Sequence, residues 1–600
     1  MSGSRPRPTA VGSLLGIALA LLLACAGPPA AAPATAPAAD AVHRRDLDVP
    51  MRDGVLLRAN LWRPAGDGPF PVLVYRTPYG KDEAERLYRT HLRAVERGWA
   101  VLLVDVRGRF ASQGDLDPYR NEGRDGFDTI EWAAAQPWSD GRVGTYGLSY
   151  PGAVQWLAAL ERPPHLRAMV PAMTFSSPRA FFTFGGVFDL SWLPWIHLSM
   201  APATRVRHDL PGARTAEEAA AFWAERGSEL LEYRPLVEVP ATRDVAPFYF
   251  EWLAHPPEDP WWDPLEIRGR YAEVDPAVLH LSGWHDEAYG PEGAATNFAG
   301  LVAARGGVES ARTELVLGPW VHGVGAVSRP VVGERDFGPD AALDYDALVL
   351  DFLDRHVRGA DLQAPPPVRY FLMGEDRWRE AQTWPPPAAR ESLFLVGGEE
   401  RGSLRHSGDG TAPDATAFVS DPEDPVRDPY AAFGAHDYRA LATGPHRAVF
   451  ETAPFAEDTE ISGPITAEVW IDCDCRDFDL WVRLFDVAPE GTAWNLMSPG
   501  LDVQRASARA PGAPRPVTPG EPVRLELDRL VTANLFRRGH RLRAIVTGSF
   551  APHLSRNLQT GASERTSSAS RPATLTILHD DAHPSRLVVP VVRGALPDPS

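Results

Sequence analysis

Short apolar runs alternate with amphipathic stretches from residue 55 to about residue 320. Continuous apolar runs that end in a turn are typical of buried parallel strands, and stretches with a 3.6-residue period are typical of helices. Strands that alternate with helices predict a parallel sheet with helices on both faces. The predicted strands are 55–62, 71–75, 99–106, 143–148, 168–173, 277–283 and 314–317, and the predicted helices are 83–97, 123–136, 151–160 and 344–358.

The alternation stops between residues 174 and 275, where aromatic residues are frequent and one amphipathic stretch, 216–231, predicts a helix. In open α/β folds, ligands bind outside the carboxyl edge of the sheet, and an insertion at this point of the chain lies above that edge. We therefore predict a helical cap over residues 174–275. Its aromatic side chains form either the core of the cap, which we favour, or part of a substrate pocket.

Beyond residue 368, short segments of alternating apolar and polar residues are separated by turns rich in Pro, Gly and Asp. This pattern predicts an antiparallel β-sandwich of jelly-roll type over residues 368–600. The α/β domain then comprises residues 42–173 and 276–367. A chain of 600 residues exceeds what one hydrophobic core usually supports, in agreement with several domains.

Residues 1–41 are typical of an export leader followed by a Pro/Ala-rich linker. Arg5 and Arg7 precede an apolar stretch, 11–23, that is too short to span a bilayer. The run LLAC that ends at Cys25 resembles a bacterial lipobox, in which Cys25 would carry a lipid; cleavage by an ordinary signal peptidase is the alternative. Either way we expect an exported protein, whether secreted, periplasmic or a cell-surface lipoprotein.

The formal net charge is −19 and the isoelectric point is near 5.4. An acidic surface repels phosphates, which argues against nucleic-acid partners and leaves membrane contact only through a lipid on Cys25. The other cysteines are Cys473 and Cys475. On a strand their thiols would share one face, and a bridge between them would be strained, so we expect two buried thiols. We expect neither a metal nor a cofactor.

The strongest chemical signal is the run VGTYGLSYPG at residues 143–152. An apolar strand leads into Ser149, and a helix begins immediately after it. A serine hydroxyl becomes an effective nucleophile when a tight turn exposes it beside a base and beside a helix N-terminus. The second glycine, Gly152, stands one place later than in the usual Gly-x-Ser-x-Gly pattern. We predict that Ser149 is the nucleophile of a serine hydrolase.

Such a nucleophile needs a histidine base and an acid at the ends of later strands, in the chain order Ser, Asp/Glu, His. The last two strands of the alternating part end in the runs WHDE, which contains Asp286, and GPWVH, which ends at His322. We therefore predict that Asp286 and His322 complete the triad. His285 is the rival base and Glu287 the rival acid.

The oxyanion of the reaction needs two hydrogen-bond donors. One predicted donor is the backbone N–H of Tyr150, which follows the nucleophile. The other should come from the loop YRTPYGK at residues 75–81, which lacks a run of glycines. We predict that the Tyr79 hydroxyl is this donor; the alternative is an aromatic residue that only packs in the loop.

Several motifs together resemble the CocE/NonD hydrolase family, which includes cocaine esterases, α-amino acid ester hydrolases and Xaa-Pro dipeptidyl-peptidases. They are RTPYGK (76–81), DVRGRFASQG (105–114), GLSYPG (147–152), GWHD (283–286), GPWVH (318–322), RLFDV (483–487), GHRLR (539–543) and RN (556–557). The resemblance spans residues 42–592 and implies an α/β-hydrolase fold with a helical cap insertion, followed by a C-terminal jelly-roll β-sandwich. It also implies the catalytic set Ser149, Asp286 and His322, with an oxyanion hole of Tyr79 and the Tyr150 backbone.

Two places depart from the family pattern. Arg109-Phe110-Ala111 stands where a glycine is common, so we expect a different loop shape there but no catalytic group. After Asp286 the chain has Glu287, not the acidic residues with which α-amino acid ester hydrolases hold a substrate ammonium group. We therefore do not expect a specific ammonium site.

The predicted activity is hydrolysis of ester or amide bonds of small acyl substrates through an acyl-enzyme. We favour an esterase over the alternative, an Xaa-Pro dipeptidyl-peptidase. A hypothesis from another class is a carbohydrate- or surface-binding protein built on an inactive hydrolase scaffold.

Overall fold

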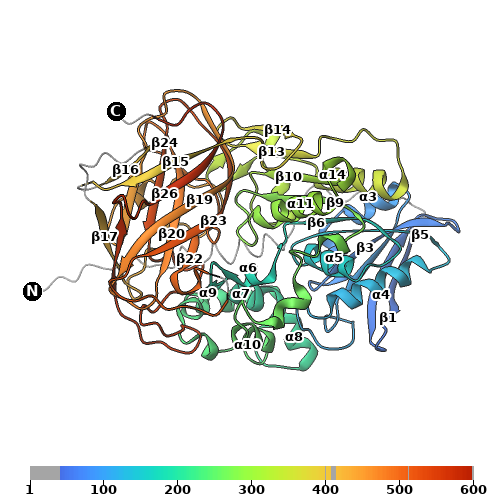
Figure 1. Ribbon diagram of the computed structural model, residues 1–600. Coiled ribbons are helices and arrows are strands. Elements are labelled where there is room, and N and C mark those ends of the chain that lie inside the picture. The colour runs from blue at the N-terminus through green and yellow to red at the C-terminus, as the bar shows by residue number, and fades with distance from the viewer. Residues whose placement is uncertain (1–40, 399–400, 407–413, 511, 598–600) are drawn as a thin grey trace, which may run out of the picture.

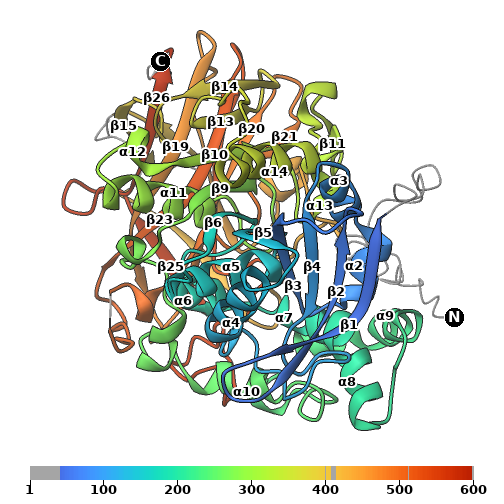
Figure 2. The same ribbon diagram turned by 90° about the vertical axis from the view of Figure 1, so that its right-hand side faces the viewer.

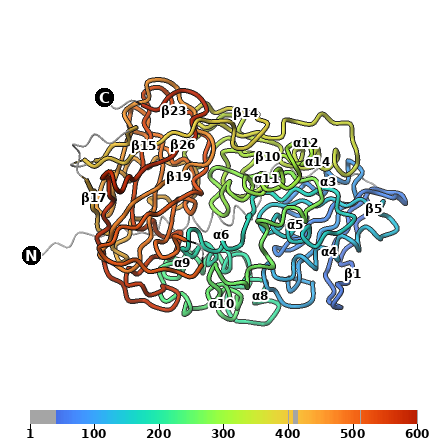
Figure 3. The backbone as a smooth tube through the Cα atoms, in the orientation of Figure 1, coloured from blue at the N-terminus to red at the C-terminus, as the bar shows by residue number. Residues whose placement is uncertain are grey.

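A computed structural model describes residues 41–398, 401–406, 414–510 and 512–597. An α/β body and a β-rich body lie side by side, with a group of helices along one side of both (Figure 1). The first described strands and the last strands of the chain lie at opposite ends of the molecule (Figure 3). The predicted leader and Cys25 fall outside the described residues. None of the described helices is long and apolar enough to cross a membrane.

The α/β body is built on a ten-stranded sheet in the order β1-β2-β4-β3-β5-β6-β9-β10-β13-β14 (Figure 2). The ladders from β4 to β13 are parallel, as predicted, and the outer ladders β1–β2, β2–β4 and β13–β14 are antiparallel. The strands are β1 (Val42–Pro50), β2 (Leu56–Arg63), β3 (Phe70–Thr77), β4 (Ala100–Asp105), β5 (Ser139–Leu148), β6 (Leu166–Ala172), β9 (Ala277–Gly283), β10 (Thr313–Gly318), β13 (Val368–Leu372) and β14 (Arg377–Ala381).

Helices cover both faces of this sheet because its central strands are apolar on both faces. In β3, Val72 and Val74 pack with α4 (Glu122–Ala134) and α5 (Tyr150–Leu160), whereas Leu73 and Tyr75 pack with α3 (Thr90–Glu96) and α14 (Tyr345–Leu353). Figure 2 shows α4 and α5 together in front of the sheet.

The single helix predicted over 83–97 is wrong. The chain forms α2 (Lys81–Leu87) and then α3, and Tyr88 between them has an extended backbone. The Tyr88 ring packs edge-on against Tyr75 at a centroid distance of 6.3 Å. This tertiary contact, which periodicity does not reveal, accompanies the break.

The first two strands beyond the predicted boundary at residue 368 belong to the sheet of the α/β body. β13 begins there but pairs in parallel with β10, with Val368 opposite Leu315, and β14 extends the same sheet. Alternation along a segment indicates a strand but does not say which sheet it joins, because that depends on the partner edge.

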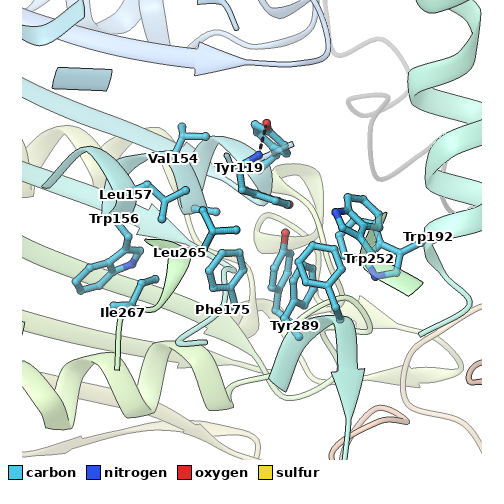
Figure 4. Packing of buried hydrophobic residues seen from close by; sticks show 14 of the residues in the cluster. Tyr119, Val154, Trp156, Leu157, Phe175, Trp192, Trp252, Leu265, Ile267 and Tyr289 are labelled. Atoms are coloured by element: carbon cyan, nitrogen blue, oxygen red, sulfur yellow. Dashed lines mark hydrogen bonds between the residues drawn. The ribbon is translucent and has the colours of Figure 1, made fainter. Parts of the chain in front are cut away.

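The segment between β6 and β9 is largely helical and includes α9 (Ala216–Glu232), close to the predicted helix 216–231. A capping box fixes its start, since Thr215 accepts from the Glu218 N–H and Glu218 accepts in return. Many of its aromatic rings pack on each other: Phe182 stacks on Trp192 with centroids 4.6 Å apart, and Trp192 lies 4.8 Å from Trp252 (Figure 4). Its other helical elements are α6 (Pro178–Phe182), α7 (Trp192–Pro194), η1 (Trp195–Met200), α8 (Ala201–His208), η2 (Leu236–Glu238), α10 (Pro247–Ala254), η3 (Pro260–Leu265) and η4 (Tyr271–Glu273).

The β-rich body contains a twelve-stranded, mostly antiparallel sheet that surrounds its own apolar core. Its longest strand, β19 (Thr459–Cys473), alternates buried and half-buried residues along its second half, as one-sided burial of a strand requires. The other strands are β15 (Ala389–Val396), β16 (Gly402–Arg405), β17 (Ala415–Ser420), β18 (Arg447–Glu451), β20 (Asp479–Val487), β21 (Ala493–Asn495), β22 (Val503–Arg505), β23 (Val523–Phe536), β24 (Arg541–Thr547), β25 (Ala573–Leu578) and β26 (Arg586–Arg593).

Cys473 and Cys475 form a disulfide, so the expectation of two free thiols is wrong. Their Cα atoms are 5.2 Å apart, within the range that a disulfide bridges and shorter than the span of ~6.6 Å between alternate residues of an extended strand. β19 ends at Cys473, and the chain bends at once, which brings the two sulfur atoms together.

Candidate active site

Ser149 lies on a sharp turn between β5 and α5. Its backbone has φ 73° and ψ −130°, a conformation that a non-glycine residue adopts only when its surroundings enforce it. The Ser149 N–H donates to the Ala172 carbonyl at 3.0 Å. A Cβ at Gly147 would lie 2.5 Å from the Pro151 Cβ, and one at Gly152 would lie 2.6 Å from the Ala172 oxygen. The turn therefore needs glycine at both positions, which explains the late second glycine.

Asp286 follows β9 and His322 follows β10, and the structure brings the two side chains together. The Asp286 Oδ1 lies 3.0 Å from the His322 Nδ1. The same oxygen accepts the backbone N–H groups of Ala288 at 3.0 Å and Tyr289 at 3.2 Å. These bonds fix the buried carboxylate, which in turn favours the tautomer that carries a proton on Nδ1 and leaves Nε2 available as a base.

The electrostatic surroundings favour the charged form of His322. Burial lowers the pKa of its imidazole, but the charge and hydrogen bond of Asp286 and the charge of Glu287 outweigh burial, so the pKa is raised. Glu287 itself accepts the His322 backbone N–H at 3.0 Å, and burial raises the pKa of its carboxyl to about 7. The rival acid thus bonds to the backbone of His322 and not to its ring.

The rival base, His285, packs beside Phe337. Its side chain is buried, its ring lies 6.2 Å from that of Phe337, and neither ring nitrogen has a partner among the described residues. Burial lowers the pKa of His285 to about 3, so this imidazole stays neutral. The geometry favours His322.

Ser149 and His322 line the same cavities, but their side chains form no hydrogen bond in the described part of the chain. Tyr289 and Tyr119 line the first of these cavities together with Ser149. Figure 4 shows Tyr289 with its hydroxyl directed toward Tyr119. Hydrogen bonds between a nucleophile and its base are commonly long in free enzymes and tighten when substrate binds, so this arrangement is compatible with the predicted pair.

Tyr79, the predicted oxyanion donor, lines both cavities together with Ser149. The Trp195 indole Nε1–H donates to its hydroxyl oxygen at 3.1 Å. Because that bond occupies a lone pair of the phenol oxygen, it restricts the directions that the phenol proton can take.

Tyr150, the second predicted donor, is the first residue of α5, so its N–H has no acceptor within the helix. Its side chain anchors the turn in the protein: the hydroxyl donates to Glu122 Oε1 at 2.8 Å and accepts the Tyr119 N–H at 3.1 Å. Glu122 is held by a buried ion pair with Arg76 at 2.5 Å.

The sequence predicts no catalytic group in the loop of Arg109, and it gives no indication that this residue positions another loop. This guanidinium is almost fully buried, and no carboxylate forms an ion pair with it within the described ranges. Its Nε donates to the Pro78 carbonyl at 2.7 Å, directly before Tyr79, and its Nη1 donates to the Met200 carbonyl at 3.0 Å and to Thr204 at 3.2 Å. Arg109 thus ties the Tyr79 loop to the end of η1 and the start of α8. No local signal distinguishes it, because its partners come from a distant part of the chain.

Two cavities meet at Ser149, and both are also lined by Tyr79, Ser199 and His322. The first, of about 110 Å³, we call the aromatic chamber. Its walls include Phe181, Phe184, Trp192, Trp195 and Phe433. The second, of about 260 Å³, we call the tyrosine chamber. Its walls include Tyr75, Tyr88, Tyr146 and Tyr345, with Thr77 and Thr90. Some aromatic residues of the inserted segment therefore also line a pocket.

The aromatic chamber contains ionisable groups that are already bonded. Asp189 accepts the Ser191 N–H at 2.8 Å and the Ser191 hydroxyl at 2.7 Å, and burial raises the pKa of this carboxyl to about 6. His553, from the β-rich body, pairs through Nε2 with Asp428 at 2.8 Å. The wall therefore combines residues of both bodies. In the part of the chain that the structure describes, no cluster of His, Cys, Asp and Glu could hold a metal ion.

Comparison with known proteins gives matches along almost the whole chain. Residues 53–324 match the family described as X-Pro dipeptidyl-peptidase (S15 family), and residues 360–588 match its C-terminal non-catalytic domain. Cocaine esterase from Rhodococcus sp. (strain MB1 Bresler) is 30% identical over 578 residues, which cover 91% of this chain and 98% of that protein.

Two solved structures are similar over the same extent. An aminopeptidase from a marine sediment Thaumarchaeota archaeon has a TM-score of 0.79 at 21% identity, covering 94% of this chain and 98% of its own. A CocE/NonD family hydrolase from Staphylococcus aureus has a TM-score of 0.65 at 21% identity, covering 92% and 94%. At these identities the structural likeness establishes the shared fold, a hydrolase scaffold followed by a β-rich domain.

Proposed function

This chain belongs to the CocE/NonD family of serine hydrolases, and on that basis we propose that it hydrolyses carboxylic esters through an acyl-enzyme on Ser149. The observation that carries the proposal is the pairing of Asp286 with His322 at 3.0 Å, beside a serine held in a strained turn.

In the proposed mechanism, His322 Nε2 removes the proton of Ser149 as its Oγ attacks the carbonyl carbon. Asp286 keeps the imidazole oriented and stabilises its charged form. The Tyr79 hydroxyl and the Tyr150 N–H bind the oxyanion. His322 then protonates the leaving alcohol, and water attacks the acyl-enzyme by the same route in reverse.

We further propose that the helical segment 174–275 serves as a cap and that the β-rich body is a jelly roll. The contact of Trp195 in η1 with Tyr79 supports the first proposal, since the segment then covers the oxyanion loop. The antiparallel ladders around β19 and β20 support the second.

An Xaa-Pro dipeptidyl-peptidase is the second candidate. The carboxyl groups of Asp189 and Glu287 in the aromatic chamber favour it, because such an enzyme must bind a substrate ammonium group. Asp189, however, already accepts two hydrogen bonds from Ser191, and Glu287 accepts one from His322. We therefore favour the esterase.

A fluorophosphonate probe tests the nucleophile. We expect labelling of the folded protein that disappears in Ser149→Ala, whose thermal unfolding should match the wild type. Failure of the folded wild type to react would refute the hydrolase and favour a binding protein on an inactive scaffold. Comparing kcat/KM for aryl esters, amino acid esters and Xaa-Pro amides then separates the two enzyme candidates.

We also propose that the protein is exported, on the basis of the apolar stretch at residues 11–23 and the sequence up to Cys25. The intact mass of the mature protein tests this. Export predicts removal of the leader, and a diacylglycerol mass on Cys25 would identify a lipoprotein. A full-length chain that retains Met1 in its native host would contradict the proposal.

A further inference from the structure

Two phenol hydroxyls that line the tyrosine chamber have no hydrogen-bond partner among the described residues. Tyr146 on β5 and Tyr345 at the start of α14 are only 5% and 4% exposed, and both line this chamber. Within the described residues, neither hydroxyl donates or accepts a hydrogen bond. Neither hydroxyl oxygen is sealed off from the open space of the chamber, so each can donate and accept a hydrogen bond with an occupant.

The two hydroxyls are neutral. Burial raises the pKa of the Tyr146 and Tyr345 phenols above the ordinary value for tyrosine. A neutral phenol both donates and accepts a hydrogen bond, and so does the hydroxyl of an alcohol. Thr77 and Thr90 add side-chain hydroxyls to the same walls, although Thr90 already donates to Asp346 at 2.5 Å and Thr77 already accepts the Tyr79 N–H at 3.1 Å. The chamber is therefore suited to a ligand rich in hydroxyl groups.

The charges along the tyrosine chamber are already paired. Apart from His322, which pairs with Asp286, its ionisable acidic and basic lining residues are Glu83 and Arg86. These two form an ion pair with each other at the surface. Among the described lining residues, no unpaired charge is left to select an ammonium or carboxylate group, so a neutral ligand fits best.

The aromatic chamber differs in chemistry although both chambers open onto Ser149. Aromatic rings such as Phe181, Trp192 and Trp195 dominate its walls. A substrate that reaches both sides of the nucleophile would thus need an apolar, aromatic half and a hydroxyl-bearing half.

We propose that the tyrosine chamber binds the hydroxyl-bearing half of the ester cleaved at Ser149, a neutral group such as a glyceryl or sugar moiety, and that Tyr146 and Tyr345 select it. The inference rests on the proposed esterase function. The hydroxyl-bearing half is either the alcohol or the acyl part, since the chemistry of the chamber is the same for both.

Two matched substrate pairs test the inference. For the alcohol side, 2,3-dihydroxypropyl benzoate is compared with propyl benzoate; for the acyl side, benzyl 2,3-dihydroxypropanoate is compared with benzyl propanoate. We expect kcat/KM to favour the hydroxylated member of one pair by about tenfold or more, because a site built to bond a hydroxyl rejects the analogue that lacks it. The pair that shows the preference identifies which half occupies the chamber.

Variants test whether the preference for the hydroxylated ester arises in the tyrosine chamber. Tyr146→Phe and Tyr345→Phe should each reduce the ratio within that pair by about fivefold, the effect of one neutral hydrogen bond. Tyr249→Phe is the matched control, because the Tyr249 hydroxyl also has no hydrogen-bond partner among the described residues, but it is fully buried and lines neither chamber. Its ratio should equal that of the wild type.

Different experimental outcomes would overturn this inference and the proposed esterase function. A wild type that hydrolyses p-nitrophenyl acetate but discriminates in neither pair overturns the inference and leaves the esterase intact. A preference that survives in the Tyr146→Phe/Tyr345→Phe double variant also overturns it. A wild type that neither hydrolyses any of these esters nor reacts with a fluorophosphonate overturns the proposed function itself. The wild-type comparison needs no variant, so a variant that fails to fold does not remove the test.

Discussion

Replacement of Trp195 by phenylalanine tests whether this indole orients the Tyr79 hydroxyl for oxyanion binding. The Trp195 Nε1 lies 3.1 Å from the Tyr79 oxygen, a normal neutral hydrogen bond. A bond of this kind is worth about 1 kcal/mol, so its loss should lower kcat by about fivefold. Loss of the phenol hydroxyl itself, in Tyr79→Phe, should lower kcat by ~10²–10³, as removal of one oxyanion donor does. KM should change little in either variant, because the hydrogen bond from the Tyr79 hydroxyl to the substrate oxygen strengthens in the transition state.

A double-mutant cycle turns this reasoning into a quantitative test. If Trp195 acts through the Tyr79 hydroxyl, Trp195→Phe should cost about fivefold in the wild type and nothing further in Tyr79→Phe, a coupling of about 1 kcal/mol. The assay is steady-state hydrolysis of one activated aryl ester by all four proteins.

Trp192→Phe is the matched control. Trp192 lines the same aromatic chamber and packs edge-on against Trp195 at 5.3 Å, but its indole nitrogen has no partner in the described ranges. The substitution removes the same volume without removing a bond to Tyr79. Equal losses from Trp195→Phe in both backgrounds would refute the reasoning and show that the indole only packs. The same conclusion follows if Trp192→Phe lowers kcat as much as Trp195→Phe does and shows the same coupling energy with Tyr79→Phe.

Three further changes test the rest of the site. The Glu287 carboxyl, whose pKa is about 7, is partly charged where His322 titrates, and Glu287→Gln removes that charge. The pKa of His322 should fall; because the base must be neutral, the acid limb of the kcat/KM profile should move to lower pH, and an unchanged limb would contradict this. Arg109→Met should lower kcat by about tenfold or more with little change in KM, because it releases the loop at Pro78; full activity in a folded variant would contradict a positioning role. Gly108→Ala should lower the free energy of unfolding by more than ~1 kcal/mol in urea titration, since φ is 72° and a Cβ would lie 2.1 Å from a backbone nitrogen; wild-type stability would refute that estimate.

The positions of Ser149, Asp286 and His322 could be predicted from local sequence because each follows a buried strand. The carboxyl ends of parallel strands share one edge of the sheet, so three strand ends far apart in the chain meet there. Once the strands are located in the sequence, the residues that follow their carboxyl ends identify most of the candidate site. The Tyr79 loop follows the same rule, since it continues from β3.

Contacts between segments could not be predicted in this way. Arg109 and Pro78 are 31 residues apart and Trp195 and Tyr79 are 116 apart, and neither contact leaves a periodic or motif signal. The same holds for β13, whose alternation is equally compatible with either sheet. The Cys473–Cys475 bridge was misjudged for a different reason: the expectation assumed an extended strand through both residues, and the strand ends at the first of them.

The β-rich body supplies part of the wall of the aromatic chamber. His553 and Leu554 line the aromatic chamber, and their backbone continues the inserted segment: the Leu190 N–H donates to the His553 carbonyl at 3.1 Å, and Asp189 forms a β-bridge with Leu554. One wall of the chamber thus exists only when the two bodies pack together. Because Asp428 accepts hydrogen bonds from the Tyr438 hydroxyl and the Tyr430 N–H as well as pairing with His553, that wall is fixed by the core of the β-rich body. Substitutions in the β-rich body should therefore alter substrate selection without changing Ser149, Asp286 or His322.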